Sequence, residues 1–193
     1  MSSAHKKVIV RRHLGDTLPG YLPLSGFVRP RSNPLTLDLL DLAGRVLPLA
    51  LADIKHIAYV RDFNLNDSAN PERLTRKTFL ARPRTEGLWL RLTYKNPNER
   101  TSTVAEVEVL EGLASIDQTL FDDALNDAGL FLTPPDIRSN TQRLYIPRSA
   151  IAELQLLAVI TTPSRTRPLP AVSVPSLQED LFDSLPTPNT RPN

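Results

Sequence analysis

The chain of 193 residues contains no cysteine, which excludes a disulfide framework, a thiol nucleophile and a cysteine zinc site. Glycine is scarce, with seven residues, and no P-loop, GxGxxG or GxSxG motif occurs, so a loop that cradles phosphate is not expected. The longest apolar stretch, around 46–52, is far too short to span a bilayer, and no apolar run follows the basic N-terminus as in a signal peptide. We therefore expect a cytoplasmic protein without a membrane partner.

The titratable residues show none of the spacings that catalysis or metal binding requires. His5, His13 and His56 form no HxxxH or HExxH pattern, and we expect each to be an ordinary surface or rim histidine. The acidic pairs Asp122–Asp123 and Glu179–Asp180 are typical of solvated acids. A net charge of +2 is too small to indicate a nucleic-acid-binding protein by itself. The sequence thus predicts no enzyme, no cofactor and no metal site.

Short apolar stretches separated by turn residues fill the first part of the chain. The predicted strands begin at Val8, Thr17, Leu35, Val46 and His56. Five strands within residues 5–63 are too short for a flat sheet with two good faces, and such a sheet usually curls and closes on itself. The pattern resembles the small SH3-like or Sm-like barrel, in which a one-turn helix links the last two strands. That turn is predicted at Ala52–Lys55.

One phrase of the first part recurs later in the chain. Its apolar residues, Leu47, Leu49, Ile54, Ile57 and Val60, align with Leu144, Ile146, Ile151, Leu154 and Leu157. An internal repeat of this kind implies two copies of one supersecondary unit. The predicted fold class is therefore mainly all-β, with two tandem small SH3-like/Sm-like barrels, one short helical insertion and a disordered C-terminal tail.

The composition sets the expected boundaries of these parts. The first barrel covers 5–63, and the polar stretch 64–76 is a linker. The second barrel covers 77–161 and contains an insertion at 112–127, whose apolar residues have helical spacing. Proline, threonine, serine and asparagine dominate 162–193, so no core can be built from this tail.

Three phrases carry a resemblance to an uncharacterised bacterial family. They are KKVIVRR, RKTFLARPRTEGLWLRL and TPPDIRSNTQRLYIPRSAI, spread over residues 6–160. The resemblance implies a shared fold. It supplies no activity, cofactor or catalytic residue.

The tail contains a segment, SLQEDLFDSLP, that resembles the short motif by which bacterial proteins dock on the DNA polymerase sliding clamp. The resemblance implies that Gln178 forms hydrogen bonds in a small subsite, and that Leu181 and Phe182 fill a hydrophobic pocket. Asp180 stands at the position where the family has serine or aspartate, whereas Glu179 departs from the common leucine. We expect micromolar affinity from so short a motif.

The same segment allows two other interpretations. Leu177, Leu181 and Leu185 recur at every fourth position between acidic residues, which suits an amphipathic helix that folds into a groove. That groove could belong to another protein or to this chain. The segment could also have no role.

The densest cluster of positive charge offers an alternative function. Its cations are Arg73, Arg76, Lys77, Arg82 and Arg84. Phosphate contacts need such cations, and single strands also stack on aromatic rings, which Phe79, Trp89 and Tyr94 could provide. The competing interpretation is a solvated linker that enters a strand, with Phe79 and Trp89 in the core. The sequence therefore predicts a non-enzymatic interaction module, with a nucleic-acid-binding regulator as the alternative.

Overall fold

The structure is a computed structural model that describes residues 5–29, 32–95, 108–118, 120, 123, 125, 128–136 and 139–161. Within these residues nearly all regular structure is β, so the predicted mainly-β fold class is confirmed. The strands are β1 (His5–Arg12), β2 (Thr17–Pro23), β3 (Thr36–Asp41), β4 (Val46–Ala50), β5 (Ile54–Val60), β6 (Gly87–Tyr94), β7 (Val109–Ala114), β8 (Gly129–Leu132), β9 (Thr141–Pro147) and β10 (Ile151–Ile160). Two single-turn 3-10 helices, η1 (Leu51–Asp53) and η2 (Arg148–Ala150), precede β5 and β10.

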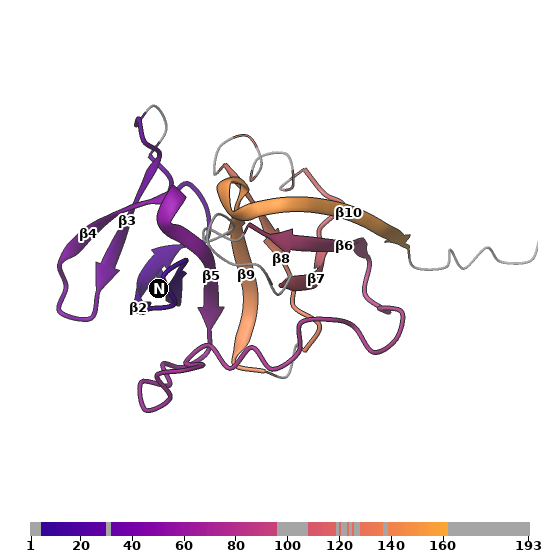
Figure 1. The fold of residues 1–193 in the computed structure, drawn as a ribbon, viewed down its shortest axis with the longest axis horizontal. Coiled ribbons are helices and arrows are strands. Elements are labelled where there is room, and N and C mark those ends of the chain that lie inside the picture. The colour runs from indigo at the N-terminus through magenta and orange to yellow at the C-terminus, as the bar shows by residue number, and fades with distance from the viewer. Residues whose placement is uncertain are drawn as a thin grey trace, which may run out of the picture. The chain divides into compact units, whose positions relative to one another are not determined.

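The strands form two antiparallel sheets. The larger sheet has the order β4-β3-β2-β1-β5-β9-β8, and the smaller has the order β10-β6-β7. Strands of the first half (β1–β5) and of the second half (β6–β10) therefore meet in the larger sheet, where β5 pairs with β9 (Figure 1). Met1–Thr162 accordingly forms one compact unit. The prediction of two tandem barrels did not foresee this shared sheet.

The two halves follow the same order of pairing. In the first half, β1 pairs with β2 and β5, β2 pairs with β3, and β3 pairs with β4. In the second half, β6 pairs with β7 and β10, and β8 pairs with β9. A single bridge between Leu113 and Thr133 links β7 to the end of β8. The internal repeat in the sequence therefore corresponds to two stretches with equivalent strands and an equivalent 3-10 turn.

Two apolar cores each take residues from both halves. One core contains Val8 and Val10 of β1 together with Phe131 and Tyr145 of the second half. Ile9 faces the other core, which consists mainly of second-half residues. Successive side chains of a strand point to opposite faces, so β1 is buried on both faces. This burial explains why its central residues are uninterruptedly apolar.

The predicted insertion at 112–127 begins too early. The sequence analysis took Gly112 as its start, but β7 continues to Ala114, and Gly112 pairs with Leu90 of β6. A Cβ atom at position 112 would lie 2.8 Å from the Cβ of Leu132, so glycine here permits a close approach between strands. Beyond the strand, the described residues Leu120, Asp123 and Leu125 are helical. Phe121 and the tail, 162–193, lie outside the described residues.

The structure also changes the interpretation of the region between the halves. No described residue of 64–76 is in a strand, and the second half acquires its first strand only at Gly87. The segment is nevertheless fixed to the fold, because the side chain of Glu72 is buried. In the described part of the chain, no helix has the length and apolar character needed to cross a membrane.

Candidate functional site

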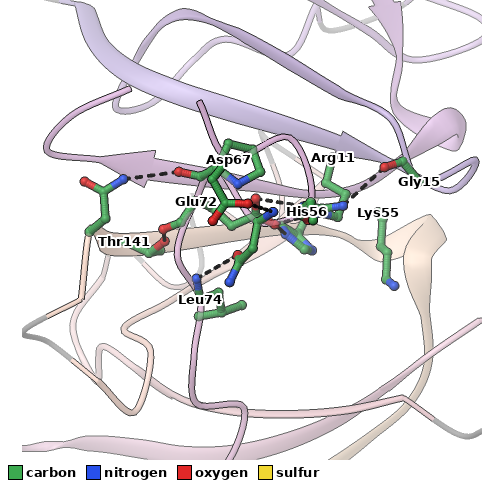
Figure 2. Close-up of polar contacts among 12 residues, drawn as sticks. Arg11, Gly15, Lys55, His56, Asp67, Glu72, Leu74 and Thr141 are labelled. Atoms are coloured by element: carbon green, nitrogen blue, oxygen red, sulfur yellow. Dashed lines mark hydrogen bonds and ion pairs between the residues drawn. The ribbon is translucent and has the colours of Figure 1, made fainter. Parts of the chain in front are cut away.

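A buried polar cluster joins the 64–76 segment to β1, β5 and β6. Arg11 Nε donates to Glu72 Oε1 at 2.6 Å, and Arg11 Nη2 donates to Glu72 Oε2 at 2.8 Å, which gives a bidentate ion pair (Figure 2). His56 Nε2 lies 3.4 Å from Glu72 Oε1, and His56 Nδ1 lies 3.4 Å from the Tyr94 hydroxyl. Thr141 on β9 donates to the backbone carbonyl of Glu72 at 2.7 Å. We call Arg11, His56, Glu72 and Tyr94 the Glu72 cluster.

The surroundings lower the pKa values of both Glu72 and His56. Burial by itself raises the pKa of Glu72, but the contacts from His56 and Arg11 outweigh it and lower the pKa to about 2. Burial lowers the pKa of His56, and the nearby Glu72 carboxylate offsets only part of this effect. Glu72 is therefore charged and His56 neutral at pH 7. The expectation that His56 lies at the surface or a rim is wrong, because its exposed fraction is 4%.

The geometry of the Glu72 cluster suits anchoring rather than reaction. Both carboxylate oxygens of Glu72 accept from Arg11, whose guanidinium also donates to the backbone carbonyls of Gly15 and Ala69. The pair therefore joins β1, the turn that follows it and the 64–76 segment. Removal of one partner would leave an uncompensated buried charge. Periodicity could not reveal this cluster, because its members are far apart in the sequence and Glu72 stands in a polar stretch.

A second buried carboxylate, Glu111, fixes the middle of the basic region at Phe79. Glu111 on β7 accepts from the Phe79 backbone N–H at 3.0 Å, from Trp89 Nε1 at 3.2 Å and from Arg91 Nη2 at 2.7 Å. The rings of Phe79 and Trp89 meet edge to face, with centroids 5.8 Å apart. Tyr94 is buried in the Glu72 cluster, so it cannot serve as a stacking platform for a base. Phe79 and Trp89 remain half-buried.

The five predicted nucleic-acid-binding cations all lie at the surface, in different surroundings. Lys77 pairs with Glu108 at 3.1 Å, and Arg73 has a left-handed backbone with φ of 52°. No salt bridge to another described residue involves Arg76, Arg82 or Arg84. The partner-binding residues of the tail, Gln178, Asp180, Leu181 and Phe182, lie outside the described residues.

A pocket that the sequence analysis missed lies where the two 3-10 turns meet. Ser149 of η2 donates to the backbone carbonyl of Leu51 in η1 at 3.2 Å. The pocket beside this contact has a volume of about 820 Å³, within the usual range for ligand sites. Its apolar lining comes from both halves and includes Leu35, Leu130 and Ile151. The turn pattern predicted each 3-10 helix separately, but it carried no signal that they would meet.

Strand β10 borders this pocket and exposes apolar side chains. Leu154, which lines the pocket, is 45% exposed, and Leu156 and Val159 are 58% and 47% exposed. Strand β10 is at the edge of its sheet, and among the described residues only β6 pairs with it. The sequence showed the recurring apolar residues Ile151, Leu154 and Leu157, but it did not show that one edge would lack a partner among the described residues.

The described residues include no group of three or more histidine, aspartate or glutamate side chains placed to hold a metal ion. A family model described as a family of unknown function (DUF6982) matches residues 4–158. No curated protein and no solved structure matches the chain. The matched range includes both halves and confirms the expected likeness to an uncharacterised family, while a bacterial origin stays a prediction. The chain belongs to this family of unknown function.

Proposed function

We propose that the protein is a non-enzymatic interaction module whose folded part binds another protein along β10. The observation that carries the proposal is the edge of this strand. It is ten residues long, contains one charged residue, Glu153, and exposes three large apolar side chains. A long apolar edge strand is a ready template for a strand of another chain, and folded proteins usually blunt such edges.

The roles of the buried titratable groups support a non-enzymatic function. Glu72 and Glu111 are each held by several donors from separate segments. Neither Glu72 nor His56 lines the pocket at the 3-10 turns. The repeated pairing order, with a 3-10 turn before the last strand of each half, also resembles the SH3-like or Sm-like barrel. We infer binding from β10 itself, because a fold alone does not define a function.

Site-specific photocrosslinking in cells of the source organism tests this function. A photoreactive residue replaces Leu156 on β10 in one strain and Leu14, which is 89% exposed, in another. We expect a discrete cross-linked species with a second protein from position 156 and none from position 14. Equal cross-linking at both positions, or none at 156, would contradict a docking role for β10.

The tail supports a more specific part of the proposal, in which the protein is an accessory of DNA replication or repair. The motif from Gln178 to Phe182 would tether the folded part to the sliding clamp, in the cytoplasm. Calorimetric titration of the source organism's clamp with the full chain should give micromolar affinity, lost in Leu181→Ala/Phe182→Ala. Leu177→Ala, outside the motif, is the matched control. Absence of binding by the unmodified chain would remove the clamp from the proposal.

The exposed arginines favour a nucleic-acid-binding regulator as a second candidate. Arg76, Arg82 and Arg84 are exposed, and no other described residue neutralises them through a salt bridge. Filter binding with single-stranded DNA and RNA should show affinity that falls steeply with salt. The triple alanine variant should reduce this salt dependence, whereas Arg45→Ala on the β3–β4 turn should not. Affinity that ignores salt, or survives the triple substitution, would exclude this role.

A further inference from the structure

The edge of β10 that no described strand pairs with combines unpaired backbone groups with exposed apolar side chains. Tyr94 N on β6 donates to Glu108 O on the β7 side at 3.0 Å, so alternate residues of β6 direct their backbone groups away from β10. Two of these, Leu92 and Leu90, pair with Leu154 and Leu156. The backbone N–H and C=O groups of Leu154 and Leu156 therefore point to the open edge. The pairing from Glu153 to Leu156 is regular, between two register shifts.

The two edge strands of the larger sheet carry features that discourage pairing. Strand β4 has only five residues, and Pro48 lies at its centre. Leu51 N donates to Leu35 O and Asp41 N to Arg45 O, so the intervening Pro48 faces outward, where it offers no N–H. Strand β8 has four residues, and its end is bridged to β7. Strand β10 contains no proline and is the longest strand in the described residues.

The pocket adjoins the regular part of this edge. Ile151 and Leu154 of β10 form one side, and Leu51 of η1 and Leu130 of β8 contribute elsewhere to the apolar lining. A side chain from a strand added along β10 would be within reach of this pocket, because side chains stand perpendicular to a sheet and alternate between its faces. Backbone pairing and an apolar pocket together are the features of peptide recognition by strand addition.

Two cations mark the polar part of the pocket. Lys95 follows β6 and Arg148 begins η2, and both are exposed residues that line the pocket. Neither forms a salt bridge with another described residue. Among the residues that the structure describes, none of those lining the pocket is acidic. The site is thus apolar with unneutralised positive charge, which complements a carboxylate next to an apolar anchor.

We propose that the β10 edge and the pocket together bind an extended, acidic peptide segment of another protein. The segment adds to β10 as a strand, places an apolar side chain in the pocket, and directs a carboxylate to Lys95 and Arg148. This inference rests on the proposed interaction function and specifies the chemistry of its partner. An acidic residue next to an apolar anchor is preferred, and a basic segment is rejected because it meets the same two cations.

Selection from a phage-displayed library of random peptides tests this chemistry, with the full-length protein as the target. We expect enrichment of sequences in which aspartate or glutamate alternates with leucine, isoleucine, valine or phenylalanine. Selected peptides, synthesised and measured by fluorescence anisotropy, should bind at least about tenfold more weakly to Lys95→Glu/Arg148→Glu. A proline placed at the centre of the peptide should abolish binding, because it removes a backbone donor.

Two further variants distinguish strand addition from nonspecific binding to exposed apolar side chains. Leu154→Lys/Leu156→Lys places charges on the edge and should abolish binding, whereas Leu14→Lys, a remote exposed leucine, should leave it unchanged. The proposal is overturned if no peptide is enriched, if the enriched peptides are basic, or if binding survives both double substitutions. It is also overturned if light scattering shows a dimer that Leu154→Lys/Leu156→Lys converts to a monomer, because a second copy would then occupy the edge.

The outcomes also separate this inference from the proposed function. A cross-link at position 156 that persists in Lys95→Glu/Arg148→Glu would keep the interaction function and reject the acidic partner. The proposed clamp binding would depend on the tail motif, so neither double substitution should affect it. Loss of the cross-link at 156, together with failed peptide selection, would reject both.

Discussion

Strands β5 and β10 occupy equivalent places in the two halves, yet their surroundings differ. Each follows a single-turn 3-10 helix and pairs with the first strand of its half. The second edge of β5 is filled by β9. Six of the seven residues of β5 are buried, and only Lys55 is partly exposed. In β10 the corresponding edge has no strand partner among the described residues. The two halves thus repeat one unit, but only the outer edge of β5 is paired with a further strand. The equivalent edge of β10 has no described partner.

The largest expected effect on stability concerns the buried ion pair between Arg11 and Glu72, which lies beside β5. Arg11→Met should lower the free energy of unfolding by about 3–5 kcal/mol, because it leaves the buried Glu72 carboxylate without its main partner. Urea denaturation measures the change. The double variant Arg11→Met/Glu72→Met should lose much less, since no buried charge remains. A loss below about 1 kcal/mol for the single variant would show that the pair is not an anchor.

A smaller effect compares equivalent positions of the two strands directly. Ile57→Ala on β5 should cost about 2–5 kcal/mol, because this side chain is fully buried. Leu154→Ala on β10 should cost less than about 0.5 kcal/mol, because the side chain is 45% exposed. Thermal and urea denaturation of both variants test the difference. Similar losses would mean that the edge of β10 is covered in solution.

The pH dependence of stability should reflect the titration of Glu72 and His56 in the Glu72 cluster. The pKa of Glu72 is lowered from 4.5 to about 2 on folding, so its contribution of about 3 kcal/mol is complete above pH 4.5 and is lost as the pH falls toward 2. The pKa of His56 is also lowered, so its protonation in the unfolded chain begins the loss below about pH 6.5. Urea titrations across this range should show a smaller change in Glu72→Gln. An unchanged acid profile in that variant would contradict the assignment.

The smallest effect on stability is expected at the exposed edge. Leu156→Lys should change the free energy of unfolding by less than about 0.5 kcal/mol, because Leu156 is 58% exposed. It should nevertheless raise the concentration at which the protein stays monodisperse, since charge blunts an edge strand. Light scattering over a concentration series measures this. Leu14→Lys is the control, and an equal gain from it would indicate a general effect of charge.

Local sequence patterns predicted the elements better than their partners. Alternating apolar residues indicated the strands, and the recurrence around Ile54 and Ile151 indicated equivalent turns. The pairing of β5 with β9 was not predictable, because periodicity identifies a buried face and not the neighbouring strand. The apolar run at Val8–Val10 did contain a usable signal, since burial on both faces of β1 removes alternation.

The candidate sites were less predictable than the fold. Motif spacing can detect residues that act close together in sequence, whereas Arg11, His56 and Glu72 meet only through tertiary structure. The pocket likewise needs both 3-10 turns in place. The exposure of the basic residues from Arg73 to Arg84 agrees with the composition of their segment, but exposure alone does not define a partner.

The central claim is that one edge of β10 has no strand partner among the described residues, while both edges of its counterpart β5 are paired. Native-state amide hydrogen exchange of the full chain, resolved to single residues, tests it most directly. The amides of Leu154 and Leu156 should exchange at least about a hundredfold faster than those of Ile57 and Tyr59 in β5. Equal protection of the two strands would contradict the claim, because the outer edge of β10 would then already be paired.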